Sequence, residues 1–78
     1  MKEIKLIKTE LKRAKKIHPV FPDDIVHQAA IVSEEAGEMV QAALNYYYHT
    51  GSIECIEHEL IQTGAMVLRM LQKLKGKL

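Results

Sequence analysis

The sequence contains a single cysteine, Cys55, which excludes an internal disulfide and any zinc site built from several cysteines. No apolar run approaches the roughly 20 residues that a helix needs to cross a bilayer. The lysine-rich start also lacks the apolar core of a secretory signal peptide. A chain without a disulfide scaffold fits the cytosol. We therefore expect a cytoplasmic protein with no membrane-spanning segment.

Lysine and arginine are missing from residues 17–68, although the chain has 11 of them and a net charge of +1. The same stretch carries eight acidic residues, whereas the basic residues gather in residues 1–16 and 69–78. A bound cation would neutralise such a concentration of like charge. The alternatives are a solvated acidic face, or glutamates paired with the basic end segments. The basic first segment has no interleaved aromatic residues, so the sequence does not predict nucleic-acid binding.

The length of 78 residues allows one domain. A single core of this size contributes only about 3–5 kcal/mol of stability, and small proteins often add disulfides, metals or further subunits. We therefore expect residues 1–78 to form a single helical domain that assembles into an oligomeric helical bundle. The expected homo-oligomer is a dimer or a tetramer.

Apolar residues recur every three or four positions in three segments, which predicts three helices and an all-α fold. The first helix is expected at residues 2–17 and ends before Pro19 and Pro22. The second begins at Asp23 or Asp24, either of which suits an N-cap. In the turn at residues 49–52, Gly51 suits the position after a helix end, which often has left-handed backbone.

The third helix is expected at residues 53–75, with Ser52 as its N-cap. Because the connection between the second and third helices is short, the two should form an antiparallel hairpin. The apolar line of the second helix comprises Ile25, Ala29, Val32, Ala36, Val40, Ala43 and Tyr47. The line of the third comprises Ile56, Leu60, Gly64, Val67, Leu71 and Leu74, with a second line of Ile61, Ala65 and Leu68 beside it. We expect the buried face of the oligomer to include these lines of the second and third helices.

The most informative segment contains Glu34, Glu35 and Glu38. Residues three or four apart share a helix face, so Glu35 lies next to Glu38, and Glu34 also reaches Glu38. These carboxylates interrupt an apolar stripe that includes Ile31 and Ala42. Partly buried like charges are costly unless they are paired or bound to a metal, and grouped carboxylates suit a hard divalent cation. The alternative is a set of surface glutamates on a wide amphipathic helix.

The third helix supplies Glu59 and Gln62, which lie three residues apart and therefore on the same side. In an antiparallel hairpin Glu59 can face Glu35 and Glu38. Three carboxylates would then converge on one point, with Gln62 beside them.

This pattern resembles that of the MazG-like, all-α nucleotide pyrophosphohydrolases. Those enzymes carry Glu-Glu-x-x-Glu and, one to two dozen residues later, Glu-x-x-Asp. The present chain has Glu34-Glu35-x-x-Glu38, then twenty residues, then Glu59-x-x-Gln62, and the glycine before Glu38 matches the family texture. The likeness covers roughly residues 25–72. It implies hydrolysis of a nucleoside triphosphate or related nucleotide to the monophosphate and pyrophosphate, with magnesium, or manganese in its place, as cofactor.

The resemblance implies that Glu34, Glu35, Glu38 and Glu59 are the catalytic residues. Glu35, Glu38 and Glu59 would be metal ligands, and Glu34 would be a further ligand or would help to position the water. Gln62 stands at the fourth metal position, where the family has aspartate, and offers only a neutral carbonyl oxygen.

The replacement of that aspartate leaves three outcomes open. The site holds one metal less tightly, Glu54 or Glu57 compensates, or hydrolysis is lost while nucleotide binding remains. The alternative function is a non-catalytic helical module that binds nucleotides or another protein. Phe21, between two prolines, could stack on a base, but we expect a hydrophobic plug against the second helix.

Overall fold

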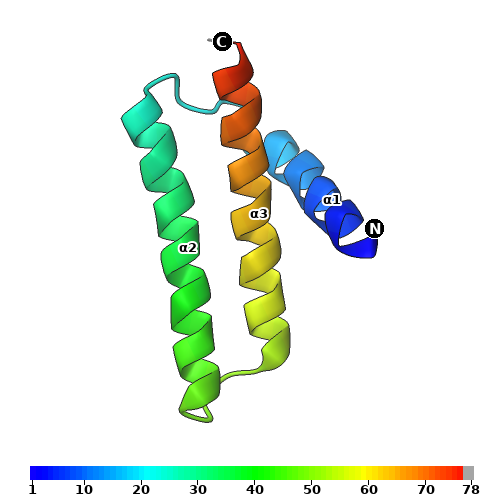
Figure 1. The fold of residues 1–78 in the computed structure, drawn as a ribbon, viewed down its shortest axis with the longest axis vertical. Coiled ribbons are helices and arrows are strands. Elements are labelled where there is room, and N and C mark those ends of the chain that lie inside the picture. Colours follow the sequence, from blue (N-terminus) through cyan, green and yellow to red (C-terminus); the bar gives the residue numbers. More distant parts are fainter. Residues whose placement is uncertain (77–78) are drawn as a thin grey trace.

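The computed structural model describes residues 1–76 and contains, within this range, three helices and no strand. They are α1 (Lys2–Ile17), α2 (Ile25–Tyr47) and α3 (Ile53–Lys75). Helices α2 and α3 form an antiparallel hairpin, and α1 packs against α3, away from α2 (Figure 1). The all-α fold and the antiparallel hairpin are thus confirmed. Across residues 1–76, none of the helices has an apolar stretch that could span a membrane.

The starts of α2 and α3 are fixed by side-chain caps. The carboxylate of Asp24 accepts hydrogen bonds from the backbone N–H groups of Val26 and His27, at 2.8 and 3.2 Å. The hydroxyl of Ser52 accepts one from the N–H of Cys55 at 3.2 Å. These bonds satisfy donors that the first turn of a helix leaves unpaired. They explain why α2 and α3 begin where the sequence predicted.

The turn between α2 and α3 differs from the prediction in one respect. His49, not Gly51, adopts left-handed backbone, with φ of 63°. The N–H of His49 donates to the carbonyl of Tyr46, and that of Thr50 donates to the carbonyl of Asn45 at 2.8 Å, which closes the helix end. Gly51 is needed for space instead, because a Cβ there would lie 3.0 Å from the Cβ of Asn45.

Helix α1 lies close to α3 because α3 has a glycine at the contact. A Cβ added at Gly64 would lie 3.0 Å from Cδ1 of Ile7. Leu11 and Ala14, one and two turns further along α1, are buried. This contact places α1 on one side of α3 and leaves α2 on another.

The core of the single chain is small. Its buried apolar side chains are Leu11, Ala14, Phe21, Ala42 and Ala65. Within residues 1–76, two polar residues are buried with them: Gln28 is fully inaccessible and Arg69 is 6% exposed. Gln28 donates to the carbonyl of Pro22 at 2.7 Å, and Arg69 donates to the carbonyl of His18 at 2.6 Å and lies 4.9 Å from the centre of the Phe21 ring. Phe21 is thus buried as expected, and its ring faces Arg69 of α3.

Of the apolar lines that the sequence marks for burial in an oligomer, the single chain leaves several residues exposed, whereas Ala65 of α3 is buried. Ile25, Val40 and Tyr47 of α2 are exposed, as are Leu60 and Leu71 of α3. The reason is geometric. Helix α2 faces α3 with the stripe of Gln28, Glu35 and Ala42, and α1 covers the side of α3 that includes Gly64. Near the start of α3, Leu60 and residues of α1 line the same groove, so α1 borders part of the remaining side of the hairpin.

Candidate metal centre

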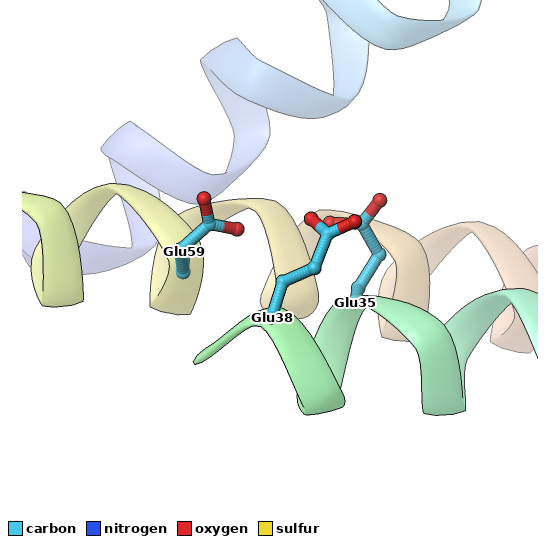
Figure 2. A group of neighbouring side chains, drawn as sticks. All are labelled: Glu35, Glu38 and Glu59. Atoms are coloured by element: carbon cyan, nitrogen blue, oxygen red, sulfur yellow. The ribbon is translucent and has the colours of Figure 1, made fainter. Parts of the chain in front are cut away.

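Three carboxylates converge on the hairpin, two from α2 and one from α3. Glu35, Glu38 and Glu59 each offer one oxygen, and these oxygens all lie within 4.8 Å of one another. Figure 2 shows Glu35 and Glu38 projecting from α2 and Glu59 projecting from α3 into the same space. The convergence that helical spacing and the antiparallel hairpin predict is therefore present in the structure.

The surroundings of this cluster disfavour negative charge. Glu35 and Glu59 are half-buried, whereas Glu38 is exposed. Oε2 of Glu35 and Oε2 of Glu59 are buried, and no described residue donates a hydrogen bond to either atom. An unpaired buried acceptor costs about 1–3 kcal/mol. Burial raises the pKa of Glu35, and the charges of Glu38 and Glu59 raise it further.

The donor set and its spacing fit a divalent cation. All three groups are carboxylates, the ligands that hard cations prefer. Two oxygens on opposite sides of a magnesium ion lie about 4.2 Å apart, and on opposite sides of a calcium ion about 4.8 Å apart, from their usual metal–oxygen distances. The oxygens of this cluster lie within the larger distance.

The other predicted site residues divide into two groups. Gln62 lies in the wall of the cavity that Glu35 also lines, so it is close to the cluster. Glu34 is exposed and outside the group of three carboxylates, although its charge contributes to the raised pKa of Glu35. Glu54 and Glu57, considered as substitutes for the missing aspartate, are exposed and also lie outside this group.

A cavity of about 430 Å³ adjoins the cluster, between α1, the connector after it and the hairpin. This volume is within the range of small-molecule sites. Polar and apolar side chains both line the cavity. They include Glu10, Arg13, Ile17, Phe21, Ile31, Glu35, Gln62, Met66 and Arg69. The sequence alone does not predict this cavity, because its walls depend on where α1 docks.

Two basic residues in the cavity wall were also missed. Arg13 donates two hydrogen bonds of 2.8 Å to the two carboxylate oxygens of Glu10, and this pairing lowers the pKa of Glu10. Arg69 is the first basic residue after the long stretch without any, and it reaches the connector from α3. The spacing of Glu10 and Arg13 is readable in the sequence, but their position beside Glu35 follows only from the packing of α1.

Comparisons of the chain with protein-family models, with curated proteins and with solved structures found no match. The likeness to the MazG-like enzymes therefore rests on the glutamate motif and its spacing. The hairpin brings the two halves of that motif together.

Proposed function

We propose that the protein is a metal-dependent nucleotide pyrophosphohydrolase. Its substrate would be a nucleoside triphosphate or a related nucleotide, and its products the monophosphate and pyrophosphate. The observation that supports this proposal is the convergence of Glu35, Glu38 and Glu59, two of which bury an oxygen without a hydrogen-bond donor among the described residues. Such oxygens are suited to a cation that neutralises them.

In the proposed reaction, Glu35, Glu38 and Glu59 would hold magnesium, or manganese in its place. A divalent cation bound there would neutralise phosphate oxygens and lower the pKa of a bound water. Glu34, one residue before Glu35, would orient the attacking water. Water would add to the α-phosphorus, the bond from that phosphorus to the bridging oxygen would break, and pyrophosphate would leave with the electron pair. Gln62 would offer a neutral oxygen beside the charged ligands.

The adjoining cavity supports a nucleotide as the substrate. It begins at Glu35 and Gln62 and extends between α1 and the connector, so phosphates held at the carboxylates would leave the nucleoside directed into it. Arg13 lies in its wall, and since its Nε and Nη2 already donate to Glu10, it would contact phosphate oxygens through its remaining N–H groups. Apolar walls from Ile17 and Met66 would contact the base or sugar.

One observation favours an alternative function. Gln62 brings no charge to the position where the related enzymes have aspartate, so the site has one negative charge fewer. A chain that binds a nucleotide without hydrolysing it, or that serves as a helical protein-interaction module, would not need that additional charge.

We also propose a homo-oligomer, a dimer or a tetramer, because only a few side chains of each helix are buried in the apolar core of the single chain.

The test is a panel of nucleoside triphosphates with magnesium or manganese, with release of pyrophosphate as the measurement. We expect at least one nucleotide to be hydrolysed, and Glu59→Gln to lower the rate at least about 100-fold, since even supporting groups at metal sites contribute 10–100-fold. Glu54→Gln is the matched control and should leave the rate unchanged. Gln62→Asp should increase it. Metal-dependent nucleotide binding without pyrophosphate release would support the alternative function instead.

A further inference from the structure

The packing of α1 brings a further carboxylate to the proposed metal centre. Gln62 stands where the related enzymes have aspartate, and the substitutes considered for it, Glu54 and Glu57, lie outside the cluster. Glu10 of α1, in contrast, lines the same cavity as Glu35 and Gln62. Among residues 1–76, Glu10 and Glu35 are the two acidic residues in the wall of this cavity. The position that lacks a charge on α3 is therefore bordered by a charge from α1.

The side chain of Glu10 is turned toward the interior. It is only 15% exposed, whereas the side chain of Arg13, its ion-pair partner, is 53% exposed. Ion pairs between residues three apart on a helix are ordinarily surface features in which both groups remain in water. Here the carboxylate lies in the cavity wall while the guanidinium stays largely in solvent. A simple surface pair with Arg13 does not require this burial.

The charge of Glu10 also acts on the acidic cluster. Burial is the largest cause of the raised pKa of Glu35, and the charge of Glu10 adds to the rise. The hydrogen bonds from Arg13 lower the pKa of Glu10 itself, so this carboxylate is ionised at neutral pH. A negative charge that opposes the ionisation of Glu35 also attracts a cation bound beside Glu35.

We propose that Glu10 is the fourth carboxylate of the metal centre, and that it supplies from α1 the negative charge that Gln62 does not supply from α3. This inference rests on the proposed function, because it concerns the same divalent cation. Glu10 lies outside the group of three carboxylates whose oxygens are within 4.8 Å of one another. It therefore acts as a charge beside the ligands, and groups in that position contribute about 10–100-fold to metal affinity.

Arg13 should oppose this role of Glu10. Both carboxylate oxygens of Glu10 accept hydrogen bonds of 2.8 Å from Arg13. The guanidinium thus neutralises Glu10, and its positive charge also repels a cation. Loss of Glu10 should weaken metal binding, whereas loss of Arg13 should strengthen it. If the pair had only a structural role, the two losses would act in the same direction, because either one breaks the same two hydrogen bonds.

Calorimetric titration of the full chain with manganese chloride tests the proposal. Glu10→Gln should raise the Kd for manganese about tenfold or more, and Arg13→Gln should lower it several-fold. Glu3→Gln is the matched control and should leave the Kd unchanged, because Glu3 is an exposed glutamate of the same helix that lies outside the cavity. In the Glu10→Gln background, Gln62→Asp should restore the affinity, because it returns the missing charge from α3.

The possible outcomes separate this inference from the proposed function. Unchanged manganese affinity of Glu10→Gln, or equal weakening by Glu10→Gln and Arg13→Gln, would overturn the role of Glu10 and leave the centre of three carboxylates intact. A wild-type chain that binds no manganese would overturn both. If Glu10→Gln does not fold, as circular dichroism would show, an unchanged or higher Kd of Arg13→Gln would by itself contradict the role of Glu10.

Discussion

Glu38→Gln should have opposite effects on stability with and without a divalent cation. Two unit charges 4.8 Å apart repel by about 0.9 kcal/mol at the dielectric constant of water and about 3.5 kcal/mol at an effective constant of about 20. Because Glu38 is exposed, the lower value applies to its two pairs, with Glu35 and Glu59. Without metal, the substitution should therefore stabilise the protein by about 1–2 kcal/mol. For a domain of this size, that corresponds to an increase in melting temperature of about 5–15 °C.

With metal the order should reverse. A ligand at a concentration of 100 times its Kd stabilises the folded state by about 2.7 kcal/mol, or about 10–20 °C for a chain of this length. The wild-type protein should show this increase in millimolar magnesium or manganese. Glu38→Gln should show much less of it, because it has lost one charged ligand.

The assay is thermal unfolding followed by circular dichroism, at one fixed protein concentration, with chelator and then with each cation. Glu54→Gln is the control. It changes an exposed carboxylate in the first turn of α3, so the baseline stability shifts slightly while the response to metal remains. The reasoning is refuted if neither cation raises the wild-type melting temperature, or if Glu38→Gln melts below the wild type in chelator.

Three further predictions concern stability alone. Gly37→Ala should stabilise the protein by about 1 kcal/mol, since a Cβ at this mid-helix position meets nothing within 4 Å. Gly64→Ala should lack this gain, because its Cβ would lie 3.0 Å from Ile7. Chemical denaturation of the two variants measures the difference. Asp24→Ala should cost about 1 kcal/mol by removing the cap of α2, measured in the same way. Because the pKa of Glu35 is raised in the folded state, the folded protein binds more protons than the unfolded chain. The stability of the metal-free protein should therefore fall as the pH rises from the ordinary carboxyl pKa through the raised pKa. Glu35→Gln should flatten this dependence in thermal melts recorded across that pH range.

Local rules predicted those parts of the structure that local interactions determine. The helix limits followed from the prolines and from caps such as Asp24 and Ser52, and the approach of Glu35 to Glu38 followed from helical spacing. Glu59 could be placed because a short turn leaves an antiparallel hairpin few alternatives.

The parts that were missed depend on contacts between helices. The sequence does not show which side of α3 the first helix covers, so the cavity and the burial of Arg69 went unpredicted. The apolar lines through Val40 and Leu60 were predicted to belong to the buried face of an oligomer, and both residues are exposed in the single chain. The left-handed residue His49 was missed because glycine is the usual choice at that position.

The attachment of α1 has a consequence for the order of folding. The hairpin forms from segments joined by a short turn, whereas α1 is held to α3 by bonds that join distant parts of the chain, such as Arg69 to the carbonyl of His18 and Lys15 to Gln72. Contacts between distant segments form late, because the intervening chain must first be ordered. We expect α1 to dock last and to detach first, as a separate cooperative unit. In native-state hydrogen exchange its amides should exchange at lower denaturant than those of α2 and α3, and each detachment would remove one wall of the cavity.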